Sequence, residues 1–152
     1  MRRQGRLPPM QVFVDSPMAD RVTEITARHP EFLDDETRGV LSLRRAPPAG
    51  LSIRFTKSVE ESMALNQVRA GAIIISASGM CDAGRIKHHL RHNLGRPECA
   101  IVIIGFQAEG TLGRRLVNGD KRVRLFGEEH AVRASVHTIG GLSAHADRDA
   151  LL

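Results

Sequence analysis

The sequence predicts an α/β fold: a Rossmann-like parallel sheet with flanking helices. Two continuous apolar runs, Ala72–Ser76 and Ala100–Gly105, are typical of parallel strands that are buried on both faces. Each run ends in a small-residue turn, and a segment with helical features follows it. Because strand, turn and helix recur in this order, we expect a doubly wound sheet with its sites at the carboxyl ends of the strands.

The first half of the chain repeats this order with weaker strands. Asp15 or Ser16 is the expected cap of the first helix, Pro17 fits its first turn, and Ser58 is the expected cap of a later helix. Residues 1–9 are basic and contain prolines, so we expect them to be poorly ordered. The patterns predict strands at 11–14 and 51–55, and helices at 17–29, from about 34 onward, and from 59 to Gly71.

After Lys121 the pattern changes. Val123–Phe126 and Ala131–Ile139 alternate polar and apolar residues with no helix between them, so we expect these two strands to be antiparallel neighbours. The segment from Gly140 to Asp147 then leads into a further helix. The change in residue pattern therefore favours a domain boundary near residue 120.

Composition limits the classes of protein. The 152 residues are 41% hydrophobic, which is enough for one α/β domain with a core or for two fragments of domains. There is no long apolar run and no signal peptide, so we expect an intracellular protein that does not contact membranes, with Cys81 and Cys99 reduced. The net charge of +5 suits a polyanionic partner, and the aromatic content of 3% favours phosphate contacts over base stacking.

The turn after the first apolar run could hold a phosphate. Ser76 and Ser78 can donate hydrogen bonds, Gly79 allows close approach, and bare amides of the following helix would face the same point. An ordinary strand-to-helix turn with capping serines explains the segment equally well. The turn contains neither a Walker loop nor the Gly-x-Gly-x-x-Gly fingerprint of dinucleotide sites.

Histidines provide the other candidates for chemistry. His145, in Ser143-Ala144-His145-Ala146-Asp147, can hold a phosphate or pass a proton, and Asp147 could orient it or cap a helix. Taken alone, a hydrogen-bonded structural role is more common for such a histidine. His88 and His92 lie one helical turn apart, but a solvated basic face is favoured over a metal-binding pair. Basic residues also gather after both turns, at Arg85, Lys87, Arg91 and Arg96, and at Arg114, Arg115, Lys121, Arg122 and Arg124.

Five motifs in order carry a resemblance to a known family. They are Asp15–Ala19, Ser76–Cys81, Gly84–Leu90, Gly105–Gly113 and Ser143–Asp147. Together they resemble the beta-CASP branch of the metallo-β-lactamase superfamily, whose RNA-processing nucleases are related to the polyadenylation-factor endonuclease. The resemblance covers residues 7–152.

The resemblance implies a zinc-dependent phosphodiesterase that cuts RNA with two zinc ions. Residues 1–120 would be the beta-CASP domain, and 121–152 a partial metallo-β-lactamase and RNA-specificity segment. His145 would contact the scissile phosphate and assist the leaving group. The residues implied to hold phosphate or RNA are Ser76, Ser78, Gly79, Ser143, Arg85 and Lys87, with Asp15 and Asp147 in capping or orienting roles.

One departure from the family changes the expectation for the isolated chain. The family's zinc-binding His-x-His-x-Asp-His motif is absent from this sequence, so the resemblance places the metal ligands outside it. We therefore expect the isolated chain to be incomplete and inactive. Its expected partners are RNA, a metallo-β-lactamase half and a second copy as a homodimer, in the cytoplasm. A non-catalytic nucleic-acid-binding module is the main alternative, and an unrelated nucleotide-binding domain is a weaker one.

Overall fold

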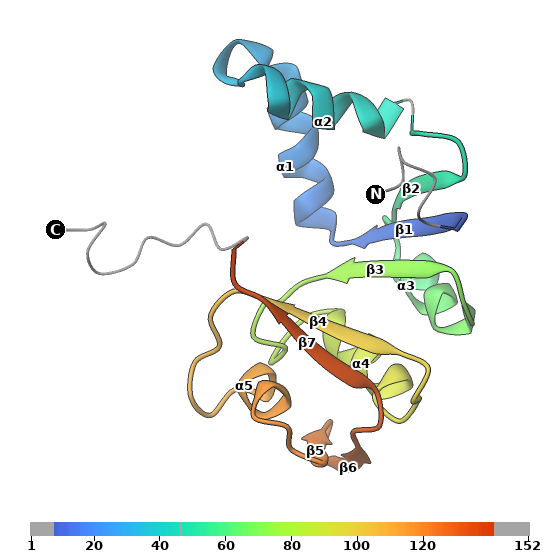
Figure 1. The fold of residues 1–152 in the computed structure, drawn as a ribbon, viewed down its shortest axis with the longest axis vertical. Helices are drawn as coiled ribbons and strands as arrows, with labels where there is room; N and C mark the ends of the chain where they lie inside the picture. The colour runs from blue at the N-terminus through green and yellow to red at the C-terminus, as the bar shows by residue number, and fades with distance from the viewer. Residues whose placement is uncertain (1–7, 46, 142–152) are drawn as a thin grey trace, which may run out of the picture. The chain divides into compact units, whose positions relative to one another are not determined.

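The chain packs as two compact units, Met1–Ser76 and Ala77–Leu152. The structure is a computed structural model that describes residues 8–45 and 47–141 (Figure 1). This division into two units does not test the predicted domain boundary at residue 120, which stays a prediction. None of the helices in the described ranges has the length and hydropathy that a bilayer crossing requires.

The first unit is built on a parallel sheet. β1 (Met10–Asp15), β2 (Leu51–Phe55) and β3 (Ala72–Ser76) form three strands in the order β2-β1-β3, as Figure 1 shows. Both pairs are parallel, and Val12 lies opposite Ile53 on one side and Ile73 on the other. This sheet and the helices of the chain confirm the predicted fold class.

Capping residues set the starts of the helices in this unit. Ser16 accepts a hydrogen bond from the Ala19 amide, and Ser58 forms a reciprocal capping box with Glu61. The third helix ends at Ala64, which is earlier than predicted, because the chain tightens into a 3-10 turn at Leu65–Gln67 and then turns at Gly71 (φ 68°) into β3. The helices are α1 (Pro17–Arg28), α2 (Asp35–Arg45) and α3 (Val59–Ala64), with 3-10 turns at Pro30–Phe32 and Leu65–Gln67.

Burial of the apolar strands differs from the prediction. Ile73 and Ile75 of β3 are exposed, and so are Val102 and Ile104 of β4 (Ala100–Ile104). Side chains alternate between the two faces of a strand, so these residues all lie on faces that the described part of the chain leaves uncovered. The expectation that both runs are buried on both faces is therefore wrong for the described residues.

In the second unit, the strands after α5 (Leu112–Val117) pair differently from the prediction. β5 (Arg122–Leu125) and β6 (Glu128–Ala131) form an antiparallel hairpin, but β7 (Ser135–Ile139) lies parallel to β4. The segment 131–139 is therefore not one strand. The amides of Arg133 and Ala134 both donate to the carbonyl oxygen of Leu94, which carries the chain away from the hairpin to the edge of β4.

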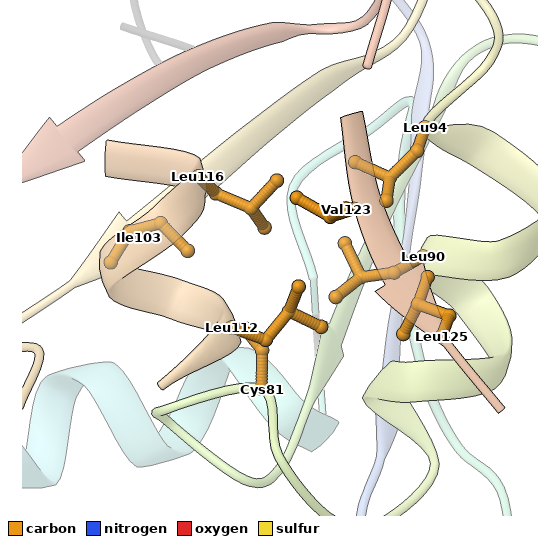
Figure 2. Close-up of a cluster of buried hydrophobic side chains, with 8 residues drawn as sticks. All are labelled: Cys81, Leu90, Leu94, Ile103, Leu112, Leu116, Val123 and Leu125. Atoms are coloured by element: carbon orange, nitrogen blue, oxygen red, sulfur yellow. The ribbon is translucent and has the colours of Figure 1, made fainter. Parts of the chain in front are cut away.

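A single apolar cluster forms the core of the second unit. α4 (Ile86–Asn93) and the residue after it contribute two leucines, and α5 contributes two more. Figure 2 shows these side chains facing those of β4, β5 and the turn before α4. The buried members are Cys81, Leu90, Leu94, Ile103, Leu112, Leu116, Val123 and Leu125. This core positions the turns at 77–84 and 105–111 that contain the candidate site.

Candidate functional site

Asp15 is buried at the carboxyl end of β1 and does not cap α1. Its carboxylate accepts hydrogen bonds from the hydroxyl of Thr56, just after β2, and from Ser62 Oγ of α3 at 2.6 Å. Of the two predicted caps, Ser16 fills the position. A carboxylate that is held by two hydroxyls fixes the strand end in one place, and the orienting role of Asp15 stays a prediction.

The serines of the predicted phosphate turn are engaged with main-chain atoms. Ser76 Oγ donates to the Asp15 carbonyl oxygen at 3.2 Å. Ser78 Oγ donates to the Ala83 carbonyl oxygen at 3.2 Å and accepts from the Ala83 amide at 3.4 Å. Gly79 is exposed beside them. The turn is therefore closed by its own hydrogen bonds.

The first amides of α4 already donate hydrogen bonds to main-chain oxygens. The amide of Ile86 donates to the Ala77 carbonyl oxygen at 3.2 Å, and those of Lys87 and His88 donate to the carbonyl oxygens of Gly84 and Arg85 at 3.4 and 3.0 Å. The prediction of bare amides at this helix start is wrong for these three residues, because the chain winds as a tight turn before α4 begins.

A second loop locks the turn in place. Gln107 is buried, and its Nε2 donates to the Gly79 carbonyl oxygen at 3.0 Å. The Gly113 amide donates to the Met80 carbonyl oxygen at 2.9 Å, and the Leu112 amide donates to Asp82 Oδ1 at 2.9 Å. Three hydrogen bonds thus join the loops that follow β3 and β4.

Gly113 is the position where this lock is tightest. A Cβ atom there would lie 1.7 Å from Gln107 Oε1 and 3.1 Å from the Met80 oxygen, so a larger residue would have to displace the Gln107 side chain. Sequence reasoning treated the segment from Gly105 to Gly113 as a motif but did not identify this contact. The glycine two residues after Thr111, within a helix, was the available indication.

Many cations of the two predicted basic regions have acidic partners. Arg96 pairs with Glu98 at 2.9 Å, Arg115 with Asp120 at 2.8 Å, and Arg122 with Glu129 at 3.2 Å. Such exposed pairs contribute little to stability but reduce the local positive charge. Lys87 instead lies over the ring of Phe126, with Nζ 4.9 Å from the ring centroid.

The described residues do not fit a metal centre. Within 8–45 and 47–141, no group of three His, Cys, Asp or Glu side chains is close enough to hold an ion. His92 lies among other basic groups of α4, and burial together with Arg91, His89 and His88 lowers its pKa. Ser143, His145 and Asp147 lie outside the described residues, so the structure does not relate them to the turn at Ser76–Gly79.

Parallel strands that alternate with turns and flanking helices define an α/β protein of the Rossmann-like class. The family model of the Beta-Casp domain matches residues 1–116. This chain belongs to the beta-CASP branch of the metallo-β-lactamase superfamily.

The names of similar proteins agree with this family assignment. The chain is 40% identical over 149 residues to Ribonuclease TTHA0252 of Thermus thermophilus, covering 97% of this chain and 34% of that protein. It is 29% identical to Transcription termination factor FttA of Methanosarcina mazei and 30% identical to that of Thermococcus kodakarensis, covering 99% and 93% of this chain and 24% and 22% of those proteins. The chain thus spans about a third or less of the length of these relatives.

Proposed function

We propose that this chain is the RNA-holding beta-CASP part of a zinc-dependent ribonuclease that hydrolyses phosphodiester bonds. The observation that carries the proposal is its likeness, along 97% of its length, to a protein named as a ribonuclease. The net charge of +5 supports a polyanionic ligand. The two zinc ions that the family resemblance implies would bind ligands outside this sequence.

The proposed roles follow the family motifs. His145 contacts the scissile phosphate and gives a proton to the leaving oxygen, with Asp147 orienting it. Ser78 would have to turn its hydroxyl proton away from the Ala83 oxygen to donate to a phosphate, because a phosphate only accepts hydrogen bonds. The other residues proposed to contact RNA are Ser76, Gly79, Ser143, Arg85 and Lys87.

The second candidate is a non-catalytic nucleic-acid-binding module. The relatedness to proteins named as transcription termination factors favours it. For either candidate we propose a cytoplasmic location, which suits the two free thiols. We also propose that the beta-CASP domain ends near residue 120 and that the chain forms a homodimer, which analytical sedimentation would test.

The test is His145→Ala in the longest protein that the gene encodes. For a ribonuclease we expect RNA cleavage to fall by about 10²–10⁴-fold while RNA affinity changes little, as for loss of a general acid. His137→Ala, at an exposed histidine of β7, is the matched control and should leave cleavage unchanged.

Unchanged cleavage by His145→Ala would contradict the role of His145. Salt-dependent RNA binding without any cleavage would favour the non-catalytic module. Stoichiometric zinc and RNA cleavage by the 152-residue chain alone would show that the metal ligands lie within it.

A further inference from the structure

The hairpin between β5 and β6 presents an aromatic side chain that neither the turn nor the core explains. Phe126 and Gly127 form its two-residue loop, and both have positive φ, at 51° and 84°. Asn, Asp and Gly suit such a loop, whereas a phenylalanine there is strained. The Phe126 side chain is also 45% exposed. A bulky residue at a strained and exposed position indicates a role outside folding.

Three side chains of α4 surround this ring. Lys87 Nζ lies 4.9 Å and the Arg91 guanidinium carbon 5.9 Å from the centroid of the Phe126 ring. The His88 ring lies at 4.8 Å from it with an interplanar angle of 35°. Residues 87, 88 and 91 share one face of the helix, so the hairpin tip and this face form one surface.

The charge of this surface is mainly positive. Glu128 pairs with Arg91 at 3.1 Å and lies 3.8 Å from His130 Nε2. No acidic partner of Lys87 is found among the described residues. The lowered pKa of the neighbouring His92, to which Arg91 and His88 contribute after burial, is consistent with a positive local potential. A polyanion would therefore be attracted to the surface.

An exposed aromatic ring flanked by cations matches the chemistry of single-stranded nucleic acid. Bases stack on such rings without regard to sequence, and Lys and Arg neutralise the adjacent phosphates. Cation–π contacts alone would stabilise the hairpin, but they do not explain why the ring occupies a loop position that suits asparagine. An acidic protein partner would be attracted to the cations but would not require the aromatic ring.

We propose that Phe126, His88, Lys87 and Arg91 form a base-stacking and phosphate-binding surface for single-stranded RNA, in addition to the turn at Ser76–Gly79. This inference rests on the proposed RNA-binding function. The low aromatic content favoured phosphate contacts over base stacking, but one well-placed ring is sufficient for a stacking site.

The experiment measures the affinity of the 152-residue chain for a labelled single-stranded RNA and for an abasic RNA of equal length. Phe126→Asn suits the turn and keeps the fold. We expect it to lower affinity for RNA about tenfold and to leave affinity for the abasic strand unchanged. Phe32→Asn is the matched control, because Phe32 is 82% exposed in the other unit, and it should change neither affinity.

The cations are tested separately. Lys87→Gln with Arg91→Gln should weaken binding to both strands and reduce the slope of log affinity against log salt by roughly 1.4. If the wild-type chain bound no RNA, the proposed function would fail. If it bound RNA and Phe126→Asn bound equally well, only the stacking surface would be wrong. Equal competition by polyglutamate, with no effect of removing the bases, would assign the surface to an acidic protein and overturn the proposal.

Discussion

The two units of the chain differ in what they bury. The second unit encloses a continuous apolar cluster of eight side chains (Figure 2). In the first unit the buried residues are largely polar, with Asp15, Thr56 and Ser62 forming a hydrogen-bonded group beside the buried Phe13 and Leu65. α1 has no buried residue, and its Met18, Val22 and Ile25 are exposed. The second unit therefore carries its own hydrophobic stabilisation, whereas the first depends more on its sheet and polar contacts.

The largest expected effect compares a leucine in the second unit with an isoleucine in the first. Leu116→Ala and Ile25→Ala remove the same number of carbon atoms, but Leu116 is 1% exposed and Ile25 is 57% exposed. We expect Leu116→Ala to lower the free energy of unfolding by about 2–5 kcal/mol and Ile25→Ala to change it by less than about 0.5 kcal/mol. Urea titrations followed by circular dichroism measure both. Similar losses would show that the apolar face of α1 is covered in solution.

A smaller effect comes from adding one methyl group to each unit. Gly113→Ala in the second unit would place Cβ against Gln107, so we expect a loss of about 1–3 kcal/mol. Gly39→Ala in α2 meets nothing within 4 Å and should stabilise the first unit by about 0.5–1 kcal/mol. The double variant Gln107→Ala with Gly113→Ala should lose less than the sum of the single changes. If the losses of stability of the two single variants simply added in the double variant, the contact between Gln107 and position 113 would be contradicted.

The smallest effect concerns the thiols and needs no mutation. Burial, with a contribution from Asp82, raises the pKa of Cys81 from 9.0 to about 11. At pH 8 roughly one Cys81 in a thousand is therefore a thiolate, and the half-buried Cys99 should be alkylated much faster by iodoacetamide. Because unfolding lowers the pKa of Cys81, its contribution to stability is full below about pH 9 and is lost as pH rises toward 11. Peptide mapping by mass spectrometry measures the labelling, and equal rates would show that the core of the second unit opens readily.

Local patterns predicted the elements of both units but not their long-range partners. Ser16 and Ser58 cap helices near the predicted starts, because a cap depends on residues three positions apart. The pairing of β7 with β4 could not be predicted, since alternation in a strand does not specify its neighbour.

The same limit applies to the candidate site. The turn at Ser76–Gly79 was identified from its residue types, but its closure by Ala83 and by Gln107 depends on contacts across the fold. The contact between Lys87 and Phe126 on the proposed stacking surface could not be predicted, because the two residues lie far apart in the chain and aromatic residues are few. His145 remains a prediction from its motif alone.

The lock between the two loops also has a consequence for the order of folding. α5 has only six residues, which is too short to be stable as an isolated helix. The amides of Leu112 and Gly113 find their partners in Asp82 and Met80, about thirty positions earlier in the chain. The start of α5 is therefore completed only once the turn before α4 has formed, so these two amides should acquire protection from hydrogen exchange together with that turn.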